Sequence, residues 1–229
     1  MALKPCLQAL ELAEKIPSGA SLLVGGFMGV GTPNRLVDAL LTLGTRDLTI
    51  YCNDTGKPGP IGIAPLVRNG QVKRVVTSHI GTNPDTQQRM IEGSLQVDLV
   101  PQGTLIERIR AGGAGLGGVL TRTGLGTVVA EGKQTLDIDG ETWLLERPIR
   151  ADFALIGCYR ADYLGNLEYS LTSMNFNPLL ALAADTVIAE PEIIVPVGVI
   201  SPDIVRTPAP LVDFLVARHH PINPTHANP

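Results

Sequence analysis

The chain has 229 residues, of which 44% are hydrophobic and 17% are charged, a composition typical of a globular protein with a substantial core. A formal net charge of −4 and an aromatic content of 4% disfavour nucleic-acid binding, which uses basic surfaces and stacking aromatics. Three scattered cysteines without a C-x-x-C motif predict neither a disulfide framework nor a metal site. Because no signal peptide and no membrane-spanning run are found, we expect a cytoplasmic protein with reduced thiols.

The N-terminal part of the chain is predicted to form a helix, a strand, a glycine-rich loop and a second helix. Apolar residues on one helical face predict the first helix over residues 3–16. Residues 21–24 are short and apolar, as in a buried parallel strand. Thr32 as N-cap and Pro33 at the first helical position then predict a helix that Gly44 ends.

Four glycines lie in the loop between this strand and this helix. Glycine has no Cβ, so a ligand can approach the main chain, and the N–H groups with the following helix dipole favour an anion. The spacing matches neither the dinucleotide motif G-x-G-x-x-G nor the phosphate-binding motif G-x-x-x-x-G-K-S/T. From its own residues, the loop is therefore either an anion site or only a turn. Its members are Gly25, Gly26, Phe27, Met28, Gly29, Val30 and Gly31.

Strands and helices alternate in the following stretch. Strands are expected at 47–52, 72–78 and 95–100, and helices at 63–68, at 84–92 and around 105–109. This alternation predicts a single open, mostly parallel α/β sheet with helices on its faces. Because the carboxyl ends of parallel strands meet at one edge, the polar segments after them should share a crevice. These segments are residues 25–31, 53–56, 78–83 and 102–104.

The C-terminal half is predicted to add an antiparallel insertion and two further buried strands. Residues 111–118 contain too many glycines for a regular element and should form a loop fixed by packing or by a ligand. Asp139 and Gly140 form a hairpin turn within 135–145, to which 127–130 should add antiparallel structure. Strands are expected at 153–157 and 186–189, with helices at 179–184 and 211–218. We expect one domain over residues 1–218 and a mobile tail over 219–229.

No residue of the chain stands out as a nucleophile. His79 is the single histidine outside the C-terminal tail, and its position beside Ser78 on an extended segment does not make a catalytic pair. Several carboxylates fall near predicted loops, Asp54 and Glu190 among them, but none has a spacing that pairs it with a second acid or a metal ligand. A chain with many backbone donors and no nucleophile is typical of half an active site.

The segment from Gly25 to Pro33 resembles the signature G-G-F-x-x-x-G-x-P of the α subunit of family I coenzyme A transferases. Further segments resemble the family in the same order, so the likeness covers nearly the whole chain and is greatest to the acetate/butyrate–acetoacetate type. The departures are Ser18, where the signature usually has Asp or Asn, and the atypical stretches 57–60 and 206–210. The further matching segments are 78–83, 101–107, 112–115 with Thr121 and Gly124, 144–148 and 175–178.

This resemblance implies a ping-pong reaction in which a glutamate attacks the thioester of an acyl-CoA, forms a glutamyl-CoA thioester and passes CoA to a short-chain carboxylate. In the family this glutamate lies in a Ser-Glu-Asn-Gly motif of the β subunit, and this chain has no Ser-Glu or Glu-Asn. The resemblance therefore implies a β partner in an α2β2 complex, with coenzyme A as substrate and no tightly bound cofactor.

The predicted site residues follow from the resemblance and from the expected crevice. The loop 25–31 is matched to the family's CoA-binding segment, and Gln102 is our candidate for a side-chain donor near the acyl group. Gly113, Gly115 and Gly117 are candidates for a wall over a small acyl chain. Two alternatives stay open at this point: a sugar-phosphate isomerase on a similar sheet, and a non-catalytic acyl-CoA-binding module.

Overall fold

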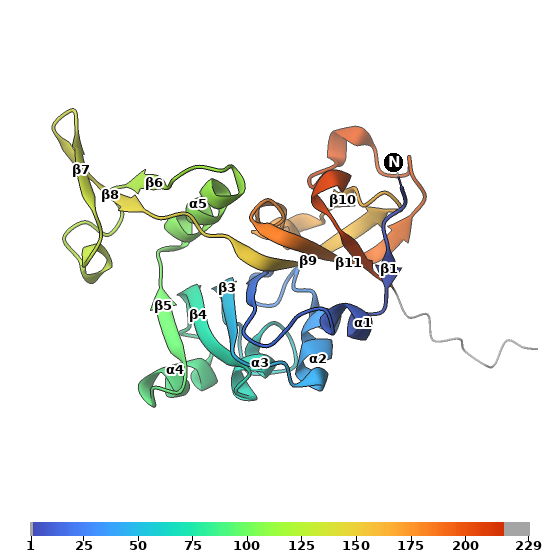
Figure 1. The fold of residues 1–229 in the computed structure, drawn as a ribbon, viewed down its shortest axis with the longest axis horizontal. Coiled ribbons are helices and arrows are strands. Elements are labelled where there is room, and N and C mark those ends of the chain that lie inside the picture. Colours follow the sequence, from blue (N-terminus) through green and yellow to red (C-terminus); the bar gives the residue numbers. More distant parts are fainter. Residues whose placement is uncertain (1, 218–229) are drawn as a thin grey trace, which may run out of the picture.

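The computed structural model describes residues 2–217, so the predicted tail at 219–229 lies outside the described residues. One nine-stranded sheet organises this part of the chain (Figure 1). All neighbouring pairs along the main path are parallel, and β10 (Leu167–Glu168) pairs antiparallel with β9. The predicted open, mostly parallel sheet is therefore confirmed. The order along the path is β1 (Cys6–Leu7), β12 (Phe214–Val216), β11 (Ala184–Val195), β9 (Ala151–Asp162), β2 (Ser21–Val24), β3 (Leu48–Asp54), β4 (Val72–His79) and β5 (Gln96–Leu99).

Helices cover both faces of the sheet (Figure 1). Helices α1 (Ala9–Ala13), α2 (Asn34–Leu43), α3 (Ala64–Arg68) and α4 (Pro84–Ile91) lie on one side, and α5 (Gln102–Gly113) and α6 (Asn177–Leu180) on the other. Within residues 2–217, none of these helices combines the length and the apolar character needed to traverse a lipid bilayer.

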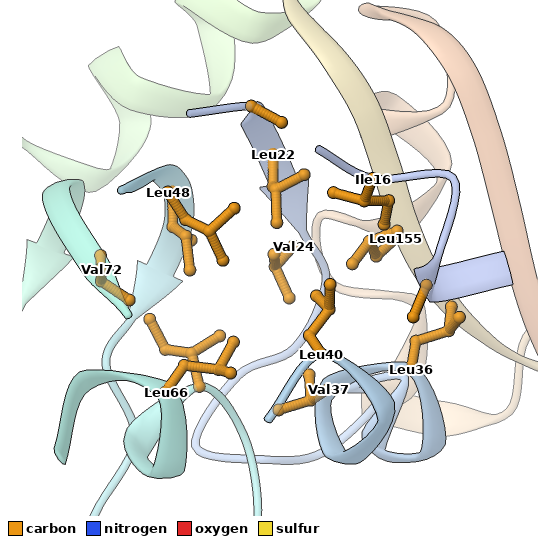
Figure 2. Close-up of a cluster of buried hydrophobic side chains, with 14 of the residues drawn as sticks. Ile16, Leu22, Val24, Leu36, Val37, Leu40, Leu48, Leu66, Val72 and Leu155 are labelled. Atoms are coloured by element: carbon orange, nitrogen blue, oxygen red, sulfur yellow. The ribbon is translucent and has the colours of Figure 1, made fainter. Parts of the chain in front are cut away.

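The two hydrophobic core clusters follow from the alternation of side chains along the strands. In β2, Leu22 and Val24 pack with Leu36 and Leu40 of α2, as Figure 2 shows. Leu23, between them, points to the opposite face and belongs to the cluster of α5 and α6. Because both faces of β2 are buried, its sequence is a continuous apolar run and does not alternate with polar residues.

The strand order contains one switch point, between β2 and β9. From β2 the chain proceeds outward through β3, β4 and β5, whereas β9, β11 and β12 extend the sheet in the opposite direction. In open α/β sheets, ligands bind in the crevice outside the carboxyl ends of the strands at such a point. The loop that follows β2, residues 25–31, begins at this switch point.

A small antiparallel sheet projects from the body of the molecule (Figure 1). Its order is β6 (Val119–Thr121), β8 (Glu141–Glu146) and β7 (Thr135–Ile138). Asp139 and Gly140 have φ of 51° and 80°, the positive values that a two-residue hairpin turn requires, so the predicted hairpin is confirmed. The segment 127–130 contains a 3-10 turn, Val128–Ala130, and the third strand is instead β6, which was not predicted.

Several predicted boundaries are wrong. The predicted helix 3–16 contains β1 and only the short α1, because Pro5 disrupts a helix and the segment pairs with β12. The described part of the predicted helix 211–218 contains the strand β12 instead, since a short apolar run does not distinguish helix from strand by its period. The helix expected at 179–184 is α6, and it ends at Leu180. Three further 3-10 turns complete the described chain: Leu171–Met174, Pro202–Ile204 and Ala209–Leu211.

Candidate functional site

The glycine-rich loop folds as a tight turn at the carboxyl end of β2. Phe27 and Val30 exchange two backbone hydrogen bonds, of 3.0 and 2.9 Å. Between them, Met28 and Gly29 have φ of 50° and 89°, the left-handed pair that a two-residue hairpin turn requires. Gly26 is also required, because a Cβ there would lie 2.0 Å from Oγ1 of Thr32.

Two asparagines at the start of α6 hold the loop against the sheet: Asn175, two residues before the helix, and Asn177, its first residue. Asn175 accepts the N–H of Gly26 at 3.3 Å and donates to the carbonyl of Val30 at 3.0 Å. Asn177 is fully buried and donates to the carbonyl of Gly31 at 3.0 Å. A Cβ on Gly25 would lie 1.7 Å from Oδ1 of Asn177. These contacts, about 150 residues apart in sequence, fix both ends of the loop.

A second network connects the loop to Gln102 through the end of β3. Gln102 donates from Nε2 to Oδ1 of Asn53 at 2.6 Å, and Asn53 donates from Nδ2 to Oδ2 of Asp54 at 3.1 Å. Met28 donates its N–H to the same Asp54 oxygen at 3.0 Å. Asn53 and Asp54 are buried, so their bonds are shielded from water and hold the two predicted donor elements in one arrangement.

The polar segments at the sheet edge contact one another, as predicted. Ser78 donates its hydroxyl to the carbonyl of Asn53 at 2.6 Å. Thr82 donates to the carbonyl of Gly56 at 2.7 Å, and Asn83 donates to that of Thr55 at 2.7 Å. The polar segments that follow β2, β3, β4 and β5 therefore meet. His79 ends β4 and no hydrogen bond to its ring is found within residues 2–217.

Most N–H groups of the loop are already occupied by groups of the chain itself. Gly25 donates to Leu155, Gly26 to Asn175 and Met28 to Asp54. Phe27 and Val30 donate to each other. Among the described residues, the N–H groups of Gly29 and Gly31 donate no hydrogen bond. These two are the backbone donors of the loop that remain for a ligand.

The N–H groups in the first turn of α2 also have acceptors within the chain. The expected roles of Thr32 as N-cap and of the helix start as a ligand donor are therefore wrong. Pro33 precedes the first helical residue and no side chain of this segment caps the helix. Glu190, from β11, instead accepts the N–H groups of Arg35 at 3.1 Å and Leu36 at 2.9 Å. A carboxylate of the protein thus already occupies the positive end of this helix.

A cavity of about 680 Å³ lies beside the loop at the switch point. Glu190 and Glu192 contribute carboxylates to its wall, and the guanidinium of Arg35 pairs with Glu190 at 3.3 Å. Burial raises the pKa of Glu190. The pKa of the Cys158 thiol is also raised, first by its own burial and then by the negative charges of Glu190 and Glu192. The wall therefore carries no uncompensated positive charge among the described residues, in contrast to a phosphate site. Its lining residues are Gly29, Val30, Gly31, Thr32, Asn34, Arg35, Gly157, Cys158, Ser173, Glu190, Pro191 and Glu192.

The predicted acyl-wall glycines are not brought to this edge. Gly113 lies in α5, and a Cβ there would meet Leu182, two residues before β11. Gly112 packs against Ile149, two residues before β9, so the glycines allow the helix to approach the amino ends of two strands. The helix has 12 residues and begins at Gln102, so Gly113 at its end lies about 16 Å from Gln102 at 1.5 Å per residue. Gly115 and Gly117 follow in an exposed loop, and this arrangement gives no support to a wall over the acyl chain.

Sequence reasoning missed the residues that hold the loop from a distance. Asn175 and Asn177 carried a signal only as part of a segment resembling the family, with no indication of what they contact. Glu190 was noted as a carboxylate near a strand end, without a partner. No spacing rule relates any of these residues to residues 25–36, because their contacts depend on β9 and β11 lying beside β2.

Comparisons with known proteins agree with this geometry. The family model described as coenzyme A transferase matches residues 8–218. The acetate CoA-transferase subunit alpha of Escherichia coli is 60% identical over 198 residues, which cover 86% of this chain and 90% of the relative. The acetoacetyl-CoA:acetate/butyrate CoA transferase alpha subunit of Clostridium acetobutylicum is 48% identical over 206 residues, which cover 90% of this chain and 94% of the relative.

A solved structure has the same fold. An acyl-CoA transferase from Escherichia coli, in a thioester complex with CoA, aligns with a TM-score of 0.85 at 25% identity. The alignment covers 94% of this chain and 47% of that one, so the chain spans about half of the larger protein. These matches do not support a sugar-phosphate isomerase. Since the family model spans nearly the whole sequence and the relatives are alpha subunits of similar length, the chain belongs to the coenzyme A transferase family as an alpha-type subunit.

Proposed function

We propose that the chain is the α subunit of an enzyme that moves CoA between a short-chain acyl-CoA and a carboxylate such as acetate or acetoacetate. The observation that carries this proposal is the 60% identity to an acetate CoA-transferase subunit alpha, together with a site that has free N–H donors and whose buried carboxylates, Asp54 and Glu190, are already engaged. Asp54 accepts three N–H groups and Glu190 accepts two. Carboxylates engaged in this way are poor nucleophiles. The reactive glutamate is therefore expected from a β-type partner.

In this proposal the chain contributes electrostatic stabilisation. Attack on a thioester carbonyl develops an oxyanion, and removing one preorganised donor to it costs about 3–4 kcal/mol. The N–H groups of Gly29 and Gly31 are the candidate backbone donors. Gln102 is exposed and uses one of its two amide N–H bonds on Asn53, so its second N–H remains for the acyl group.

The test is reconstitution. The chain and a β-type subunit with a Ser-Glu-Asn-Gly motif are purified separately and together, and CoA exchange between acetyl-CoA and acetoacetate is measured. We expect transfer by the complex and none by either chain alone. Borohydride reduction or mass spectrometry after incubation with acyl-CoA should locate the glutamyl thioester on the β chain. Turnover by the lone α chain would contradict the proposal.

A carboxylate of this chain, Glu192, allows a direct test of whether the nucleophile lies on the α subunit. Glu192 borders the cavity, is exposed, and accepts no hydrogen bond within residues 2–217. Glu192→Gln should retain transfer in the complex. Loss of transfer together with loss of the thioester adduct would assign the nucleophile to this chain instead.

The assembly and location follow from the same proposal. We expect an α2β2 complex, which native mass spectrometry of the co-expressed chains would measure. The three free cysteines fit a reducing cytoplasm, and fractionation of the source cells tests this.

A further inference from the structure

Glu190 connects β11 to the first turn of α2. It lies on β11, and its side chain is 11% exposed. Its two carboxylate oxygens accept the N–H groups of Arg35 and Leu36, at 3.1 and 2.9 Å. These are N–H groups of the first turn of α2, which have no acceptor within the helix. Glu190 therefore supplies from another strand the cap that the sequence around Pro33 lacks.

Arg35 extends this connection to the C-terminal end of the described chain. Its guanidinium pairs with Glu190 at 3.3 Å and donates to the carbonyl oxygens of Pro191 at 2.9 Å and Ala217 at 2.7 Å. The first turn of α2 is thus held by β11 and by the segment after β12. Gly31 is three residues before the first residue of α2, so a displacement of this turn is transmitted directly to the loop.

The charged and titratable groups that face Glu190 are Arg35 from α2, Cys158 from β9 and Glu192 from its own strand. Burial raises the pKa of Glu190, and Arg35 with the two N–H groups opposes this rise. A protonated Glu190 would have one weaker acceptor oxygen and would lose its ion pair. The hold on α2 is therefore strongest when Glu190 is ionised.

We propose that Glu190 is a positioning residue for the transfer reaction, which fixes the first turn of α2 and with it the donors Gly29 and Gly31. This inference rests on the proposed function of those two N–H groups. It assigns to Glu190 a role in the geometry of the transition state, without any contact to the substrate. Its removal should therefore lower kcat more than it raises KM.

The experiment compares Glu190→Gln with Glu168→Gln in the α–β complex. Glu168 is a matched control, because it is also largely buried and paired with an arginine, Arg160 at 2.6 Å, but contacts no helix start. We expect Glu190→Gln to lower kcat by about tenfold or more, with KM for acyl-CoA within about twofold, and Glu168→Gln to do neither. As the pH is lowered, kcat of the wild-type complex should fall when Glu190 becomes protonated, and kcat of Glu190→Gln should show no such fall.

Two outcomes of the kinetics would overturn the proposal: an unchanged kcat in Glu190→Gln, or equal losses in both variants. Amide hydrogen exchange of a peptide covering residues 29–36 provides a readout that does not depend on activity. Faster exchange in Glu190→Gln than in Glu168→Gln supports the positioning role, and equal exchange contradicts it. If the wild-type complex transfers no CoA, the proposed function fails, and the exchange measurement alone decides whether Glu190 holds the loop.

Discussion

The backbone N–H of Met28 donates to Oδ2 of Asp54 at 3.0 Å, across the gap between two adjacent strand ends. The same carboxylate accepts from Asn53 at 3.1 Å and, through Oδ1, from Gly56 at 2.8 Å. Asp54 is 8% exposed, and no cation pairs with it among residues 2–217. Three N–H donors therefore satisfy this buried carboxyl group, and they orient the glycine loop relative to Gln102.

Asp54→Ala should destabilise the fold and impair the site. It leaves the N–H groups of Met28 and Gly56 without their acceptor, and we expect the free energy of unfolding to fall by about 2–4 kcal/mol. Urea unfolding monitored by circular dichroism measures this. Asp203→Ala, at an exposed position, is the control and should stay within about 0.5 kcal/mol. Equal stabilities of the two variants would show that the Asp54 network contributes nothing.

Gly25→Ala should lower the free energy of unfolding far more than the same substitution at Gly103. The new Cβ would lie 1.7 Å from Oδ1 of the buried Asn177, and we expect a loss of about 3 kcal/mol because this side chain has no space to move. Gly103→Ala is the matched control, since nothing lies within 4 Å of a Cβ there. As a helical position it should stay within about 1 kcal/mol of the wild type. A melting temperature for Gly25→Ala equal to that of the control contradicts the close contact.

A substitution of Gly29 would not show whether a loss of activity comes from a less stable fold or from a blocked ligand. Gly29 has φ of 89°, and a Cβ there would meet Ile61 at 2.6 Å. A larger residue would thus strain the turn as well as block a ligand.

Gln102→Ala separates these effects better. The side chain is exposed and has one hydrogen bond, to Asn53, so stability should change by about 1 kcal/mol or less. If Gln102 donates to the developing oxyanion, kcat of the α–β complex should fall about 10²–10³-fold. The comparison is Gln96→Ala, at an exposed position on β5, assayed in the same complex. Wild-type kcat in Gln102→Ala would remove this residue from the proposed mechanism.

The three cysteines should differ in reactivity toward iodoacetamide. Cys6 is exposed, whereas Cys52 and Cys158 are buried. Burial raises the pKa of the Cys52 thiol to about 12 and raises that of Cys158 further above the ordinary value. Alkylation requires the thiolate, so peptide mapping of the native protein should find label on Cys6 alone.

The pH dependence of that reaction has a defined direction. Partial burial also raises the pKa of Cys6 above the ordinary value of a thiol, so its thiolate fraction near neutral pH is small and the rate should rise about tenfold per pH unit below that pKa. In urea, all three cysteines should react. Labelling of native Cys158 as fast as Cys6 would show that β9 opens in solution.

The parts of the fold that were predictable are those with local causes. The run at 21–24, the glycines at 25–31 and Gly44 are typical of strand, loop and helix end, and the alternation of such units indicates a parallel sheet. The predictions were wrong where the residue type at a position is required by a contact with residues far along the chain. Gly112 and Gly113 indicated a loop, but they lie in α5 because Ile149 and Leu182 approach the helix too closely for a side chain.

The order of residues along the chain was enough to predict that several polar loops follow parallel strands, that these loops meet at one edge, and that the chain lacks an evident nucleophile. Which N–H groups of the glycine loop remain available depends on the folded arrangement of the strands. That outcome depends on acceptors from Asn175, Asp54 and Glu190, which reach the loop and helix α2 because β3 and β9 flank β2 and β11 lies beside β9. Hydrogen bonds act over about 3 Å in space and are indifferent to separation along the chain, so their partners appear only once the strand order is known.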